Sequence, residues 1–367
     1  MGQPPSSNRR EFLQGRAAAD AIGAAIDRFV PTGATSRPDD DANHAEQGEH
    51  YLVQLSRPAM ACTFAVFLNA GQYEQGSEAA LTALDRIEEL EGQLTVYRDT
   101  SDVMRINRAA ALADVELEPG LFDLLSLAAR ISQATGGAFD MTAGPLVKVW
   151  GFYKRAGGIP REDDLRAALA NVGSHHVTLD ADQRTIRLER PGVELNLGAI
   201  GKGYALDRAA EVLIGEGVYD FLLHGGQSSV LARGSHAGRR DGWIVGLADP
   251  VRPERRLAEI RLRDRALATS GASHQFFRSQ GKRYGHILDP RTGWPAEGVF
   301  SSTVVAPSAA EADALSTAFY AMGVTAAEEY CSQHPEIGMV LLHPGRGASS
   351  VEVAVAGLGE DQFRQIT

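Results

Sequence analysis

In the stretch Glu194-Leu195-Asn196-Leu197-Gly198-Ala199-Ile200-Gly201-Lys202-Gly203-Tyr204-Ala205-Leu206-Asp207, a short alternating strand breaks at closely spaced glycines and resumes as a helix. Glycines at such a junction let backbone groups approach an anion, and the new helix presents unpaired N–H groups there. Lys202 is followed by Gly203, so the P-loop pattern is absent, and the dinucleotide fingerprint occurs only in reversed spacing. The pattern predicts either a phosphate site or a tight strand-to-helix connection.

A second segment offers oxygen ligands for a metal. A capping-box pattern at Ser308 and Glu311 predicts a helix over residues 309–322. Asp313 and Thr317 lie four residues apart, which places a carboxylate and a hydroxyl on one helical face, as Mg²⁺ prefers. A solvated aspartate and a threonine bonding back to its own helix are the alternative. Against that alternative, the neighbouring helix surface consists of small apolar residues: Ala310, Ala314, Ala318 and Ala321.

Three further glycine-rich loops carry polar or aromatic residues. Residues 135–142 place Phe139 and Asp140 after Gly136-Gly137, suited to a planar ring and its polar edge, although a helix C-cap explains the glycines equally well. Residues 284–293 place His286 at a strand end, in a loop shared with Asp289 and Arg291. Residues 224–229 leave another strand through Gly225-Gly226, for which we expect a plain turn.

Bulk composition describes an ordinary globular chain. It has 367 residues, 44% of them hydrophobic and 23% charged, with a net charge of −11. The acidic balance argues against nucleic-acid binding, and we expect no transmembrane segment. Cys62 and Cys331 form no metal or disulfide motif, so we expect both to be buried.

We expect an N-terminal tail over residues 1–49 and one catalytic body over residues 50–360. Residues 8–14 resemble a degenerate twin-arginine export signal, interrupted by charges at Arg16, Asp20 and Asp27, and residues 31–49 have a linker composition. The protein is therefore expected to be either cytoplasmic or exported to the periplasm. An exposed helix without targeting value is the alternative for this segment.

Hydrophobic periodicity predicts an α+β fold with a mixed β-sheet core and packed helices. We expect a hairpin from residues 51–55 and 64–68, a helix capped by Ser77 whose apolar face includes Leu81, and a helix over residues 121–134. Further strands are expected at residues 176–179, 186–188, 221–224, 243–247, 260–262, 303–306 and 339–342. The local signatures of serine hydrolases, zinc peptidases and thiol redox proteins are absent.

The order of these segments resembles the ApbE family, the FAD:protein FMN transferases. The resemblance covers nearly the whole chain after residue 50. The segments that carry it are residues 60–64, 97–99, 101–107, 135–140, 196–207, 225–226, 243–250, 269–271, 286–293 and 312–317. Each motif is weakly specific alone, but their common order is highly specific.

The resemblance implies a T-fold-like body and Mg²⁺-dependent transfer of FMN from FAD to a threonine or serine of an acceptor flavoprotein, with release of AMP. It implies an FAD site formed by Met60, Tyr97, Ala138, Phe139, Asp140, Asn196, Lys202 and Leu288, with Tyr97 stacking on a ring. The metal ligands would be the Ala199 carbonyl, Asp313 and Thr317. For proton transfer we expect His286, placed by Asp289.

The chain departs from the family pattern at Asn196, where relatives have an acidic residue, at Ala61-Cys62, where they have Gly-Thr, and at residues 224–228, where a carboxylate is missing. Two other functions therefore stay open: an Mg²⁺-dependent FAD pyrophosphatase and a non-catalytic flavin carrier. Residues 270–273 also resemble an acceptor sequence for self-flavinylation, but we favour a structural role for that segment. The sequence does not identify the acceptor or the oligomeric state.

Overall fold

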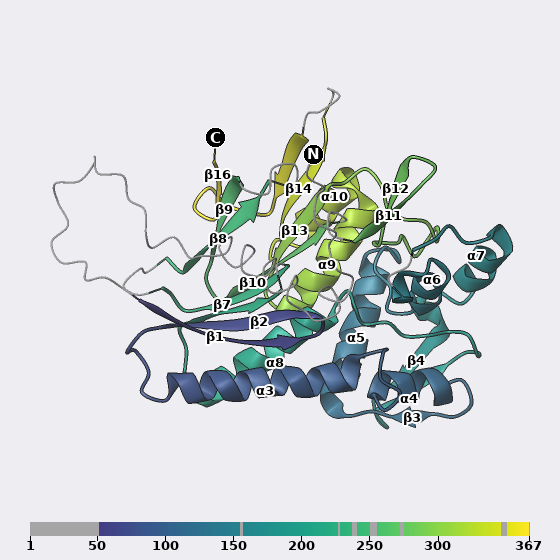
Figure 1. Ribbon diagram of the computed structural model, residues 1–367, viewed down its shortest axis with the longest axis horizontal. Coiled ribbons are helices and arrows are strands. Elements are labelled where there is room, and N and C mark those ends of the chain that lie inside the picture. Colours follow the sequence, from purple (N-terminus) through teal and green to yellow (C-terminus); the bar gives the residue numbers. More distant parts are fainter. Residues whose placement is uncertain are drawn as a thin grey trace, which may run out of the picture.

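A computed structural model describes residues 51–154, 157–226, 228–236, 241–249, 255–271, 275–345 and 351–366 (Figure 1). The expected N-terminal tail and export signal lie outside these residues. Strand β16 carries the fold to Gln365, beyond the expected end of the body at residue 360. No helix in the described ranges is long and apolar enough to cross a membrane.

An eight-stranded sheet forms the centre of the molecule. Its strands in spatial order are β1 (Leu52–Ala59), β2 (Cys62–Asn69), β6 (Phe221–Gly225), β7 (Ser229–Arg233), β10 (Arg265–Gly271), β13 (Ser301–Ala306), β14 (Gly338–Pro344) and β15 (Val351–Ala356). Every neighbouring pair is antiparallel. The α+β class is thus confirmed, but the strand directions are not mixed.

Each face of this sheet is covered by a different layer. Side chains alternate along a strand, so Phe64 and Val66 of β2 enter the core beneath the helices, whereas Ala65 and Phe67 enter the core on the opposite side. The helical layer contains α3 (Gly76–Leu94), α5 (Pro119–Ala134), α8 (Gly201–Gly215), α9 (Ala309–Met322) and α10 (Val324–Gln333). The opposite layer is a three-stranded sheet of β16 (Phe363–Gln365), β9 (Arg256–Leu262) and β8 (Trp243–Ala248).

Smaller elements extend the body beyond α5 (Figure 1). They are α4 (Asp102–Ala109), α6 (Gly144–Val149), α7 (Glu162–Leu169), two 3₁₀ turns (Phe152–Lys154 and Ser174–His176), a sheet of β3 (Val115–Glu116), β5 (Thr185–Leu188) and β4 (Val177–Asp180), and a hairpin of β11 (Phe276–Ser279) and β12 (Lys282–Gly285). A third hydrophobic cluster around Trp150 and Leu288 joins α6, α7 and this hairpin.

Most expected elements are confirmed, with local differences. The β1–β2 hairpin forms, and α5 ends at Ala134 before two glycines with positive φ. Helix α3 begins at Gly76 rather than being capped by Ser77, and Leu81 is 45% exposed because it faces away from the core.

The strand expected before Gly198 is only an isolated bridge between Glu194 and Ala143. The Asn107 side chain bonds the N–H and C=O of Leu195, and Asn196 N–H donates to the Met141 carbonyl. These bonds satisfy the backbone where a neighbouring strand would otherwise do so.

Candidate functional site

The site is built around the crossing of α8 and α9. A Cβ atom at Gly203 would overlap the Ala309 carbonyl, so the two helices approach closely only because residue 203 has no side chain. The predicted cap on α9 is present, since the Ser308 hydroxyl accepts from Glu311 N at 3.2 Å. The glycine-rich junction and the capping-box helix are therefore adjacent in space.

Each of these helices supplies a carboxylate to the first turn of the other. Asp313 on α9 accepts from Gly203 N at 3.1 Å, and Asp207 on α8 accepts from Ala309 N and Ala310 N at 2.8 and 2.9 Å. Burial raises the pKa of Asp207 to about 6, against the two backbone donors, which lower it. This reciprocal capping fixes Asp313 at the start of α8.

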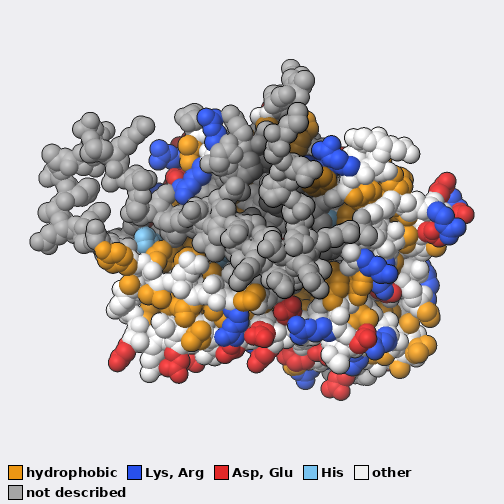
Figure 2. Space-filling model, in the orientation of Figure 1, with side chains coloured by type: hydrophobic (Ala, Val, Ile, Leu, Met, Phe, Trp, Pro, Cys, Tyr) orange, Lys and Arg blue, Asp and Glu red, His pale blue; other side chains and the backbone are white. Residues whose placement is uncertain are grey.

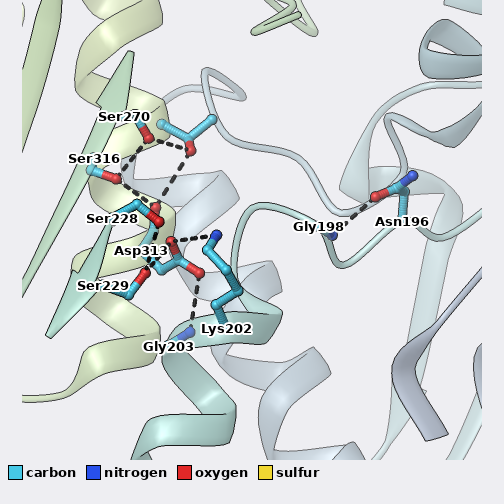
Figure 3. A network of polar contacts seen from close by, with 10 residues as sticks. Asn196, Gly198, Lys202, Gly203, Ser228, Ser229, Ser270, Asp313 and Ser316 are labelled. Atoms are coloured by element: carbon cyan, nitrogen blue, oxygen red, sulfur yellow. Dashed lines mark hydrogen bonds and ion pairs between the residues drawn. The ribbon is translucent and has the colours of Figure 1, made fainter. Parts of the chain in front are cut away.

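The Asp313 carboxylate is buried, and only one cation is close to it among the described residues (Figure 3). Lys202 Nζ lies 3.5 Å from Oδ1, and the Ser229 hydroxyl lies 3.4 Å from the same oxygen. Both separations are long for hydrogen bonds. The carboxylate consequently keeps acceptor capacity that its protein partners do not fill.

Hydroxyl groups form a small network beside Asp313. Ser270 Oγ lies 3.0 Å from Thr317 Oγ1 and 2.8 Å from Ser316 Oγ, while the hydroxyls of Ser316 and Thr317 lie 2.9 and 3.4 Å from the Asp313 carbonyl. The alternative interpretation of Thr317, in which its hydroxyl bonds back to its own helix, is thus partly confirmed. Ser270 lies within this network, which agrees with the structural role expected for residues 270–273.

This donor set suits a hard divalent cation. A carboxylate, a hydroxyl and backbone carbonyls are oxygen ligands of the kind that Mg²⁺ takes. In the described ranges no group of three His, Cys, Asp or Glu side chains could hold a metal. Ala199 lies in the turn three residues before Lys202, and Asn196 accepts from Gly198 N at 2.9 Å and so shapes that turn.

The tip of the β1–β2 hairpin lies beside the same site. Met60 and Ala61 have φ angles of 49° and 59°, and Cys62 follows them. Burial raises the pKa of the Cys62 thiol to about 11, and the charges of Lys202 and Asp313 act on it in opposite directions. A Cβ at Gly226 would lie 3.2 Å from Cys62 Sγ, so the Gly225-Gly226 exit meets this tip. Cys62 was expected only as a buried apolar residue.

The loop over residues 135–142 faces inward. Ala138 and Phe139 belong to the main core, with exposed fractions of 0% and 3%. Both Asp140 oxygens are occupied by five donors of the fold: Ser132 Oγ, Thr142 N, Thr142 Oγ1, Ser174 N and Ser174 Oγ, at 2.5–2.9 Å. In this structure the Phe139 ring and the Asp140 carboxylate support the loop, and their roles toward FAD stay predictions.

His286 is positioned differently from our expectation. Its backbone N–H and its Nδ1 both lie within hydrogen-bond distance of the Gln275 carbonyl, at 3.2 and 3.0 Å. The Asp289 carboxylate instead binds the Arg291 side chain through two bonds of 2.9 Å, so the prediction that Asp289 places His286 is wrong. A carbonyl only accepts hydrogen bonds, so Nδ1 is the protonated nitrogen in this contact.

Two other predicted FAD-site residues have contrasting environments. Tyr97 is 66% exposed, and its ring centroid lies 4.8 Å from that of Tyr153, so one face of a tyrosine pair is open for stacking. Leu288 is buried in the cluster around Trp150, and its backbone bridges to Pro295. Only the backbone of Leu288 is therefore suited to meet a ligand.

Sequence reasoning did not place Asp207, Ser229, Ser270 and Ser316 beside Asp313 or its helix. The Thr269-Ser270-Gly271 segment offered a signal, as did the position of Asp207 in the second turn of the expected helix. Ser229 had no signal because it meets Asp313 only through the tertiary fold, whereas Ser316 lies three residues after Asp313 on α9 and bonds its carbonyl within the helix.

Comparison with known proteins gives a consistent result. The model of the ApbE family matches residues 60–341. The FAD:protein FMN transferase of Klebsiella pneumoniae is 31% identical over 277 residues, covering 75% of this chain and 85% of the relative. The protein of the same name from Vibrio cholerae is 32% identical over 278 residues, covering 74% and 81%.

Solved structures of similar proteins share the fold. The ApbE protein of Thermotoga maritima superposes with a TM-score of 0.73 at 29% identity, covering 82% of this chain and 96% of that one. The flavin transferase ApbE of Vibrio cholerae gives a TM-score of 0.72 at 27% identity, covering 84% and 97%.

Proposed function

This chain belongs to the ApbE family, and we propose on that premise that it catalyses Mg²⁺-dependent transfer of FMN from FAD to a threonine or serine hydroxyl of an acceptor flavoprotein. An enzyme of the FAD:protein FMN transferase type is supported by the relatives. The observation that carries the finer proposal is the buried Asp313 carboxylate, underfilled by its partners, at the first turn of α8.

In the proposed reaction, the acceptor hydroxyl oxygen forms a bond to the phosphorus on the FMN side of the pyrophosphate. The bond from that phosphorus to the bridging oxygen breaks, and AMP leaves with that oxygen. The hydroxyl proton passes to a base. Such a displacement depends mainly on positioning and charge neutralisation rather than on covalent catalysis.

Asp313, Thr317 and the Ala199 carbonyl would hold the ion in this proposal. When bound, Mg²⁺ would neutralise negative charge on the phosphate oxygens. Lys202, in the first turn of α8, adds a positive charge beside the pyrophosphate.

The remaining roles fall to residues around the two ends of FAD. Tyr97 offers its exposed ring for stacking on a planar group. His286 is the proposed proton acceptor through Nε2, because Nδ1 is engaged by the Gln275 carbonyl. Asp289 orients Arg291 rather than His286.

The test is incubation of the purified protein with FAD, Mg²⁺ and the acceptor flavoprotein of the Vibrio cholerae relative, with that relative as positive control. We expect AMP and an acceptor heavier by one FMN phosphoester, in equal amounts and only with Mg²⁺. If AMP and free FMN appear at equal rates without an acceptor, the protein is an FAD pyrophosphatase rather than a transferase. Tight FAD binding without AMP release would make the protein a flavin carrier.

A further inference from the structure

The β11–β12 hairpin is a basic segment on an acidic protein. Between Asp264 and Asp289 the chain contains no Asp or Glu, and the hairpin itself carries Arg278, Lys282 and Arg283. The whole chain has a net charge of −11, so everything outside the hairpin sums to −11 − 3 = −14. Acidic side chains gather along the lower edge of the molecule, where α3 and α4 lie, and a few lie with basic ones at its right end, where α7 lies; the hairpin is at the upper right of the same view (Figures 1 and 2).

The hairpin places two arginines side by side on its outer face. Arg278 pairs directly with Arg283 in the strand register, and Phe276 lies on the same face. Like charges directly opposite each other destabilise a strand pair. Lys282 is neutralised by Glu297 at 2.7 Å, but Arg278 has no ion pair among the described residues. The strand register therefore places Arg278, which has no ion pair in the described ranges, directly opposite a second cation.

The inner face fixes the hairpin to the body. The rings of Phe277 and Tyr284 stack at 5.2 Å, and they lie 6.2 and 6.0 Å from the Trp150 ring. On the outer face, the Arg283 guanidinium lies 3.9 Å from the centroid of Phe276, which is 40% exposed. The outer face is thus a preformed cationic and aromatic surface, of the composition common at protein interfaces.

This surface lies close to the site where transfer would occur. Ser270 contacts Thr317, and Gln275 follows five residues later, so chain length limits their Cα separation to about 18 Å. The Gln275 carbonyl also meets His286 at the base of the hairpin. A protein partner is wider than this separation, so one bound to the outer face can reach the site with another part of its surface.

We propose that Phe276, Arg278 and Arg283, the outer hairpin face, dock an acidic surface of the acceptor flavoprotein. This inference rests on the proposed function and describes how the enzyme would select its acceptor protein. Complementary charge steers an encounter and fixes its orientation, so the face acts on acceptor KM rather than on the chemical step.

The experiment compares two double variants of the full chain. Arg278→Glu with Arg283→Glu reverses the outer face and exchanges one like-charge pair for another. Arg130→Glu with Arg184→Glu reverses two other exposed arginines, one on α5 and one in the turn between β4 and β5, and is the control. Both variants have a net charge of −11 − 4 = −15. The measurements are kcat and KM for the Vibrio cholerae acceptor, the Kd for FAD, and the thermal midpoint.

We expect the hairpin variant to raise acceptor KM by about tenfold or more, with kcat and the FAD Kd unchanged. High salt should raise the wild-type KM and remove the difference, because it screens exposed charges. The control should match wild type. An unchanged KM would overturn the docking role, as would a weakened FAD Kd, which would assign the arginines to FAD phosphates.

Two further outcomes separate the possible failures. If the hairpin reversal leaves acceptor KM unchanged but abolishes binding to vesicles of anionic phospholipid, the face serves a membrane surface instead. If wild type neither releases AMP nor modifies the acceptor while the Vibrio cholerae enzyme does both, the proposed function fails and the docking role fails with it.

Discussion

Two buried aspartates in glycine-rich surroundings differ in how the fold uses them. Asp140 accepts five hydrogen bonds of 2.5–2.9 Å from the side chains and backbone around it. Asp313 accepts one backbone bond of 3.1 Å, with Lys202 and Ser229 at 3.5 and 3.4 Å. The comparison shows that burial alone does not identify a ligand-binding carboxylate. Unfilled acceptor capacity is the property from which we infer that Asp313 is a ligand-binding carboxylate.

The largest effect is expected for Asp313→Asn. Asparagine keeps an oxygen for Gly203 N–H but loses the charge that a divalent cation needs. We expect FMN transfer to fall by about 1,000-fold, equivalent to about 4 kcal/mol of transition-state stabilisation. Stability should change by only about 1 kcal/mol. Initial rates of AMP release and urea denaturation would measure the two quantities, and full activity in this variant would contradict the comparison.

Asp140→Asn should act on stability instead. One of the two backbone donors, Thr142 N or Ser174 N, would face the amide NH₂ whichever way the side chain is oriented. We expect the free energy of unfolding to fall by about 4 kcal/mol, because several charge-assisted bonds are lost together. Urea denaturation measures this. Asp123→Asn, at an exposed position on α5, is the control and should stay within about 0.5 kcal/mol.

Gly203→Ala tests the helix crossing that brings Asp313 to α8. The new methyl group would overlap the Ala309 backbone, which cannot move without separating the two helices. We expect a loss of about 3 kcal/mol in unfolding free energy. Gly215→Ala, where nothing lies within 4 Å of the added carbon, should be neutral or slightly stabilising. Equal midpoints for the two variants would rule out a close crossing.

Asp207 gives a smaller effect that depends on pH. Its pKa is about 6 in the folded protein, against 3.8 as the ordinary value, so the folded state binds the proton more tightly than the unfolded state. The stability contribution is therefore present below about pH 4 and is lost as pH rises through 6. Relative to Asp207→Asn, wild type should lose about 2 kcal/mol between pH 4.5 and 6.5. A difference of the opposite sign would mean that the backbone donors keep Asp207 ionised.

Local patterns predicted much of this architecture. Alternation over residues 51–68 identified the first hairpin, and the capping box identified α9. The spacing of Asp313 and Thr317 put both residues in one polar network, whereas the close approach at Gly203 is made by the α9 backbone rather than by the anion that the glycines suggested. These features depend on neighbours within a few positions of the sequence, where helical and strand geometry fix the arrangement.

The features that the sequence did not predict depend on contacts between distant segments of the chain. The five donors of Asp140 include Ser174, 34 residues away, and nothing in the local sequence shows that the fold fills this carboxylate with hydrogen bonds. Asp289 and His286 are three residues apart, yet Asp289 pairs with Arg291 and His286 with Gln275, because the turn directs the two side chains to different partners. The expected strand before Gly198 failed for the same reason, since Asn107 takes its backbone bonds.

The most direct test of the central claim is Mn²⁺ binding, followed by electron paramagnetic resonance in the presence of FAD, for wild type, Asp313→Asn and Asp140→Asn under conditions where all three are folded. We predict one bound Mn²⁺ in wild type and in Asp140→Asn, and weakening of at least about 100-fold in Asp313→Asn. Retention of the ion by Asp313→Asn, or its loss only in Asp140→Asn, would contradict the assignment of Asp313 as the ligand-binding carboxylate.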